Sequence, residues 1–203
     1  MDTILGRSKP SAQATFFLAG RDNAGLVGAA IRVISHRQCE TYVRAMHANE
    51  PEIDGLTIDD HVKARLARQD ILDAPEPTNA HFVLSESCLR RMWGDAEVMR
   101  EQLDYLVKVS NRPNVMIQVM PFRTPPGRRS PIGNHFVLLR VPSPGAAGPL
   151  ELAYVEGEGE IRYLDDKKAL AAHDTAWARL TSAALSFDES RKFIAKVARE
   201  FKK

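Results

Sequence analysis

Four short β-prone runs in the second half of the chain constrain the fold most. They cover residues 115–120, 135–141, 150–156 and 160–164, and turn-rich stretches separate them. Because the runs follow one another closely and no helical segment joins them, they predict strands that pair antiparallel. Helical patterns on both sides then predict an α+β fold, with N-terminal helices, a central antiparallel sheet of about 4–6 strands, and C-terminal helices.

Apolar residues recur at helical spacing outside these runs. The stripe that begins at Val98 and Met99 predicts a helix that Asp95 caps and that ends before Pro113. Ser186 is expected to cap the last helix of the chain. The other predicted elements are strands at 14–18 and 81–84, helices at 24–33, 36–48 and 57–72, one helical turn at 86–92, and helices at 166–184 and 187–202.

The composition indicates the number of domains, the cellular compartment and the class of partner. The 203 residues are 44% hydrophobic, enough for one substantial core, so we expect a mobile tail at 1–12 and a single domain at 13–203. With 28 Lys and Arg against 26 Asp and Glu, the net charge of +2 gives direct nucleic-acid binding no support. Two cysteines, no signal-peptide layout and no long apolar run predict a cytoplasmic protein that does not enter a membrane.

Common catalytic signatures are absent from the sequence. It contains no Walker pattern, no Gly-x-Gly-x-x-Gly, no Cys-x-x-Cys, no His-Glu-x-x-His and no Gly-x-Ser-x-Gly. The six histidines are dispersed along the chain, although three of them could still converge in space. We therefore expect no cofactor and no metal site.

Several spaced motifs resemble one protein family. The run from Ser85 to Gly94, the stretch 98–103 and the stretch 119–122 resemble the effector domain of actinobacterial, Streptomyces-type antitoxin-like transcriptional regulators. That domain of unknown function usually follows an XRE-type helix-turn-helix. The resemblance covers the chain from about residue 14 to its C-terminus, and its further matching stretches are 65–69, 113–115, 133 with 136–139, 153–156 and 184–190.

Two departures from the family pattern matter. A helix-turn-helix of this type needs roughly 60 residues ahead of the effector domain, and about a dozen precede it here. The resemblance therefore implies an effector domain without its own DNA-binding head. The family's Pro-Gly-Leu-Leu-Gln-Thr motif falls on residues 34–39, and its two leucines correspond to His36 and Arg37.

The stretch 35–40 has two interpretations. Ser35 and Gln38 have the spacing of a capping box, which would make the stretch the start of a helix. Alternatively, His36 is a neutral catalytic base, Glu40 orients it, and Cys39 is a nucleophile. The structural alternatives are a hydrogen-bonded core histidine for His36 and a small core residue for Cys39.

Other polar side chains are candidate ligand contacts, each with a structural alternative. Arg65 and Arg68 could hold an acidic ligand through paired hydrogen bonds, or lie on a solvated helix face. Glu86 follows a strand at the start of a helical turn, where a structural cap is favoured over a catalytic acid.

The third β-prone run offers further candidates. Tyr154 and Glu156 project to the same side of their strand. A pair of Glu156 with Arg162 would be ordinary cross-strand stabilisation or the lining of a pocket. The complete set of candidate ligand-binding residues is Arg37, Gln38, Tyr42, Arg65, Arg68, Glu86, Tyr154, Glu156 and Arg162.

Three functions follow from these observations. The first hypothesis is a stand-alone effector domain that binds a small molecule or a protein partner and performs no chemistry. The alternative is a cofactor-independent enzyme evolved from this domain, which carries out proton transfer, cyclisation, elimination or addition in a natural-product pathway with His36 as its base. A third is DNA binding through a partner subunit that keeps the helix-turn-helix. Assembly as a homodimer is left open.

Overall fold

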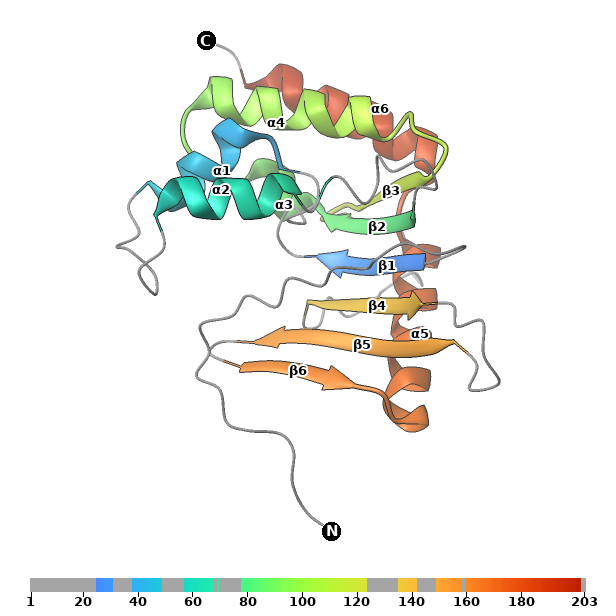
Figure 1. The fold of residues 1–203 in the computed structure, drawn as a ribbon. Coiled ribbons are helices and arrows are strands. Elements are labelled where there is room, and N and C mark those ends of the chain that lie inside the picture. Colours follow the sequence, from blue (N-terminus) through green and yellow to red (C-terminus); the bar gives the residue numbers. More distant parts are fainter. Residues whose placement is uncertain are drawn as a thin grey trace.

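A computed structural model describes residues 25–30, 38–48, 57–67, 69, 78–123, 135–141, 149–157 and 160–201 (Figure 1). These residues form a mixed α+β structure, as the sequence predicts, and none of their helices is long and apolar enough to cross a membrane. The elements in chain order are β1 (Gly25–Ala30), α1 (Glu40–His47), α2 (Ile58–Ala67), β2 (Asn79–Ser85), α3 (Glu86–Arg90), α4 (Ala96–Val109), β3 (Val115–Met120), β4 (Phe136–Val141), β5 (Leu150–Gly157), β6 (Glu160–Leu164), α5 (Lys167–Ala183) and α6 (Phe187–Glu200).

The strands form one mixed sheet in the order β3-β2-β1-β4-β5-β6. β1, β2 and β3 are parallel to one another, whereas β4 is antiparallel to β1 and continues as an antiparallel ladder with β5 and β6. The predicted antiparallel pairing is therefore confirmed for β4 to β6 and wrong for β3, which pairs parallel with β2. The physical reason is that α3 and α4 return the chain to the same end of the sheet before β3 begins, which makes the next strand parallel.

Two predictions about the first half of the chain are wrong. Residues 25–30, predicted to be helical, form β1, which pairs with β2 on one side and β4 on the other. Its glycines weaken a helix, and these strand pairings override the local preference. α1 begins at Glu40 with Cys39 as its N-cap, so the capping box predicted at 35–38 is not what starts the helix. Residues 1–12, 14–18 and Ser35 lie outside the described residues.

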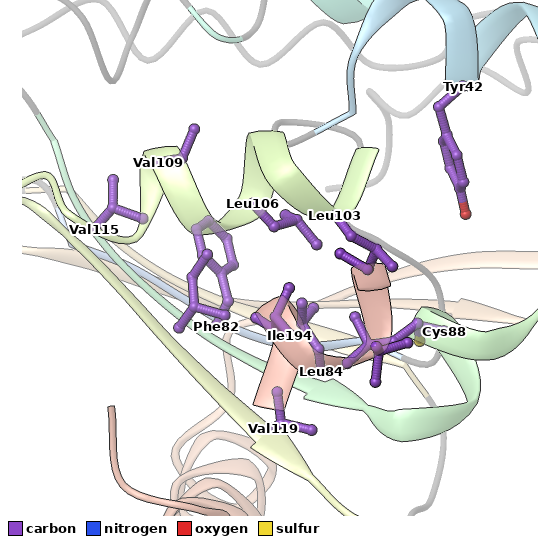
Figure 2. Packing of buried hydrophobic residues seen from close by; sticks show 14 of the residues in the cluster. Tyr42, Phe82, Leu84, Cys88, Leu103, Leu106, Val109, Val115, Val119 and Ile194 are labelled. Atoms are coloured by element: carbon purple, nitrogen blue, oxygen red, sulfur yellow. The ribbon is translucent and has the colours of Figure 1, made fainter. Parts of the chain in front are cut away.

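Helices cover both faces of the sheet. On one face, α4 and α6 pack against each other and over β2 and β3, α1 packs against α4, and α2 packs against α1 (Figure 1). α5 lies on the opposite face, behind the middle strands. Because side chains alternate along a strand, Phe82 and Leu84 join the core under α4 and α6, whereas Val83 joins the core under α5. Figure 2 shows Phe82 between the sheet and Leu106 of α4.

Helix caps fix the approach to α4 and α6. Asp95 accepts hydrogen bonds from two backbone amides of α4, and Ser186 and Glu189 form a capping box at α6, as the sequence predicts. Gly94, just before Asp95, has a φ of +74°, and a Cβ added there would lie 2.9 Å from the Cβ of Ala45 in α1. A glycine is therefore required where α1 meets the start of α4.

The stretch 184–190 covers the outer edge of β3. The Leu185 amide donates to the carbonyl of Val119 over 2.9 Å, and the Val119 amide donates to Ser190 Oγ over 2.9 Å. Ser190 is fully buried. These bonds satisfy backbone groups that an edge strand otherwise exposes, which gives a structural reason for one of the matched motifs.

Candidate functional site

The carboxyl ends of the three parallel strands meet at one edge of the sheet, here called the carboxyl edge. β1 ends at Ala30, β2 at Ser85 and β3 at Met120. The registers place Phe136 of β4 and Val155 of β5 at the same edge. In open sheets with parallel strands, ligands bind outside the carboxyl ends, where the connections of neighbouring strands diverge. Here β1 leads into α1 from this edge, whereas β4 begins at it and runs to the opposite edge before β5.

Matched motifs and predicted site residues gather at the carboxyl edge. The stretches 85–86, 120–122 and 154–156, all part of the family resemblance, end there. The segment 31–37, which contains His36 and Arg37, joins β1 to α1 and lies outside the described residues. The fold therefore brings together motifs that are far apart in the sequence.

Glu86 in α3 contacts the backbone that follows β3 and, through Arg90, is connected with α6. Its Oε1 accepts from Arg90 Nε over 2.6 Å, and its Oε2 accepts from the Phe122 amide over 2.8 Å. Arg90 Nη1 also donates to Glu200 in α6 over 2.6 Å. Glu86 is 8% exposed and both of its oxygens are bonded, which indicates a structural carboxylate. The residue that caps α3 is Ser85.

Gln38 is the centre of a hydrogen-bond network that we call the α1–α2–α4 junction. Its Oε1 accepts from Arg65 Nη1 over 2.7 Å, although the two residues are 27 positions apart. Its carbonyl accepts from Gln69 Nε2 over 2.8 Å, and Gln69 Oε1 accepts from the Tyr105 hydroxyl over 2.6 Å. The structure thus brings two predicted site residues, Gln38 and Arg65, into direct contact. Arg68 lies outside the described residues.

Cys39 meets α4 at the same junction. Its amide donates to Gln102 Oε1 over 2.8 Å, and its Sγ lies 3.2 Å from Thr41 Oγ1. Burial raises the pKa of the Cys39 thiol, which disfavours the thiolate that a nucleophile needs. Gln102 is fully buried, and the sequence analysis did not single it out. Its polar side chain within the apolar stripe of α4 was the signal that could have identified it.

Glu40 has a partner within its own helix. Its Oε1 accepts from Arg44 Nε over 2.9 Å, and Arg44 Nη1 donates to Asp59 of α2 over 2.7 Å. These exposed ion pairs connect α1 with α2. The predicted role of Glu40 in orienting His36 stays a prediction, because His36 lies outside the described residues.

The candidates on β5 and β6 are arranged differently from the prediction. The register pairs Arg162 with Val155 and Tyr154 with Tyr163. The same register pairs Glu156 with Ile161, so Glu156 and Arg162 do not stand directly opposite each other. The predicted pairing of their side chains stays a prediction, because the side chain of Glu156 lies outside the described residues. The rings of Tyr154 and Tyr163 lie 5.5 Å apart. Tyr42, another candidate, is 2% exposed and belongs to the core.

His81 is a titratable residue that sequence reasoning did not select. Gln118 donates through Nε2 to the carbonyl of Leu185 over 2.9 Å, which identifies its other terminal atom as the acceptor. That Oε1 lies 2.9 Å from His81 Nε2, so the neutral ring carries its proton on Nε2. Trp177 and Phe187 contact the ring edge to face. Burial lowers the pKa of His81, and the bond to Gln118 opposes this shift.

Acidification is expected to destabilise the protein through His81. Because the pKa of His81 is lowered in the folded state, the unfolded chain binds a proton first as the pH falls below about 6.5. The loss of stability should level off below the folded-state pKa. Urea unfolding at about pH 7.5 and about pH 5 should show a smaller loss for His81→Phe than for the unmodified protein. An equal loss in both would contradict this assignment.

The described residues define a mixed α+β domain with three parallel strands and helices on both faces of the sheet. No group of three or more His, Cys, Asp or Glu among them could hold a metal ion. The family model described as "Domain of unknown function (DUF5753)" matches residues 28–196, and the chain belongs to this family. No curated protein and no solved structure matched the chain significantly.

Proposed function

We propose that this domain is an effector domain that binds a small molecule at the carboxyl edge. The observation that carries the proposal is the convergence of the ends of β1, β2 and β3 with the matched stretches 85–86, 120–122 and 154–156. Parallel strands place their following loops together at this edge, which is the usual ligand position in such sheets. The two residues that depart from the family pattern, His36 and Arg37, lie in the sequence between β1 and α1.

In this proposal, the α1–α2–α4 junction couples ligand binding to the packing of the helices. The segment 31–37 leads directly into Gln38, whose hydrogen bonds hold Arg65 and Gln69. A ligand that fixes this segment therefore acts on the packing of α2 through Gln38. The resemblance to actinobacterial antitoxin-like regulators of the XRE type supports a regulatory role, in which this change is read by a protein partner.

An enzyme is the second candidate function. It is favoured by His36 and Arg37, which stand where the family pattern has two leucines. The raised pKa of Cys39 and the pairing of Glu40 with Arg44 weaken the other two catalytic assignments. What remains is proton transfer by His36, without a covalent intermediate.

A ligand screen with paired variants tests the proposal. The melting temperature of the full chain is measured with a panel of nucleosides, amino acids, aromatic acids and short acyl compounds. We expect at least one class to stabilise the protein and this stabilisation to fall in His36→Leu and Arg37→Leu. Arg140→Leu is the matched control, because Arg140 pairs with Glu151 near the opposite edge of the sheet and should leave the response unchanged.

The outcomes separate the two functions. Stabilisation that is equal in all variants would place the ligand away from the carboxyl edge and contradict the proposal. No stabilisation by any class would contradict small-molecule binding for those classes. Consumption of a stabilising compound over time, followed by mass spectrometry and lost in His36→Leu, would favour the enzyme.

A further inference from the structure

The two outermost strands of the sheet, β3 and β6, differ in how their outer sides are covered. Residues 184–190 cover the outer side of β3 through Leu185 and Ser190. β6 ends the sheet on the other side, and none of the described residues pairs with its outer side (Figure 1). Its five residues pair with β5 in one unbroken register, and they include no proline and no lysine. Because bulges, prolines and lysines commonly keep an outermost strand from pairing, β6 is suited to pair with another strand.

The side chains along β6 combine an exposed aromatic ring with charges of both signs. Tyr163 is 46% exposed, and its ring centre lies 5.5 Å from that of Tyr154. Arg162 projects to the other face of the sheet and is exposed, as is Asp166 just after the strand. Asp166 keeps an extended backbone, with φ −71° and ψ 142°, before α5 begins. One extended stretch therefore carries an arginine and an aspartate on the same face, with Leu164 midway between them.

Two-fold symmetry makes this charge pattern self-complementary. When two identical strands pair antiparallel about a two-fold axis, the residue on the axis faces its own copy, and residues equally far on either side of it face each other. An axis at Leu164 places Arg162 of each copy opposite Asp166 of the other. An axis at Arg162 would place two arginines opposite each other, and like charges directly opposite destabilise a sheet. The charges therefore favour the axis at Leu164.

We propose that the domain forms a homodimer in which β6 pairs antiparallel with β6 of a second copy, about a two-fold axis at Leu164. The six-stranded sheet then continues from one copy into the other. Asp166 Oδ1 accepts from the Ala169 amide over 2.9 Å, so its Oδ2 is the atom that accepts from Arg162 of the second copy. The interface uses the outer side of β6 and not the carboxyl edge, so it goes beyond the proposed ligand binding and does not depend on it.

Sedimentation equilibrium of the full chain tests the proposal. We expect the mean mass to rise from that of one chain towards that of two chains between about 1 and about 200 μM protein. Arg162→Glu and Asp166→Lys should each weaken association by about tenfold or more, because each places like charges opposite one another. Arg140→Glu is the matched control, because exposed Arg140 lies on β4, away from the interface, and its loss should leave association unchanged.

Mixing the two variants gives the sharpest result. In an equimolar mixture of Arg162→Glu and Asp166→Lys, the new glutamate faces the new lysine and the remaining arginine faces the remaining aspartate. The mixture should therefore dimerise although neither variant does so alone. Such recovery also shows that both variants are folded. Asp166→Asn removes the charge and retains a good N-cap for α5, so it should weaken association without lowering the melting temperature by more than a few degrees.

Three results would overturn the proposal. The first is a chain that stays monomeric over the whole concentration range. The second is a dimer that neither single charge reversal weakens, or that the mixture does not restore. The third comes from hydrogen exchange: slow exchange of the outward β6 amides that does not change with protein concentration would show that another part of the same chain covers β6. Exchange that slows as the dimer forms supports the proposed interface.

Discussion

Replacing Arg90 with methionine is expected to lower the free energy of unfolding by about 2–3 kcal/mol. The substitution removes the cation from Glu86, whose carboxylate is 10% exposed and then keeps only the Phe122 amide as a donor. Removing one partner of a well-buried ion pair costs more than this range, but the side chain of Arg90 is 37% exposed, so water already screens the pair. Urea unfolding at neutral pH measures the loss.

A double-mutant cycle separates the interaction energy of the Glu86–Arg90 ion pair from the effect of each substitution on packing. The variant Glu86→Gln with Arg90→Met carries no unpaired buried charge, so it should lose less stability than the sum of the two single variants. Arg140→Met is a suitable control, since Arg140 and its partner Glu151 are both exposed. Additive losses at Glu86 and Arg90 would show that the two side chains do not act as a pair.

Phe82→Ala is expected to have the largest effect of the substitutions considered, a loss of about 3–5 kcal/mol. Phe82 is 1% exposed and lies in the core between the sheet and α4, so removal of its ring leaves a cavity among buried side chains (Figure 2). Such a loss is a large share of the stability of an ordinary domain. Thermal and urea unfolding both measure it.

Phe122→Ala provides the matched phenylalanine control. Phe122 is 64% exposed, and its bond to Glu86 uses the backbone amide, which the substitution retains. We expect a change within about 0.5 kcal/mol. Equal losses at positions 82 and 122 would contradict the assignment of the core. Because Phe122 follows β3 at the carboxyl edge, the same variant also reports whether that exposed ring contributes to ligand binding.

The structure explains why distant motifs accompany one another in the sequence. Gln38 and Arg65 form one hydrogen bond, Glu86 binds the amide of Phe122, and Ser190 binds the edge of β3. Each pair joins two stretches of the family resemblance. The motifs of this family are thus largely points at which separate elements are held together around the carboxyl edge.

Local patterns were sufficient for most of the helices and strands. Residues 115–120 and 160–164 form strands with the predicted bounds, and Asp95 and Ser186 cap their helices as predicted. These features depend on neighbouring residues alone, through side-chain alternation, helical spacing and the bonding of free amides at a helix start. The α+β class followed from the order of these elements.

Contacts between residues far apart in the sequence decided the features that local patterns did not predict. β1 is a strand because β2 and β4 provide hydrogen bonds on both of its sides, although its composition does not favour a strand. The register of β5 and β6 places Arg162 opposite Val155 and Tyr163 opposite Tyr154, and one residue of shift would have given each of them another partner. The stacking of the His47 and His61 rings forms only when α1 packs against α2. The hydrogen bond from the Cys39 amide to Gln102 forms only when the start of α1 meets α4. Such contacts depend on how elements approach one another, and local sequence patterns do not encode that approach.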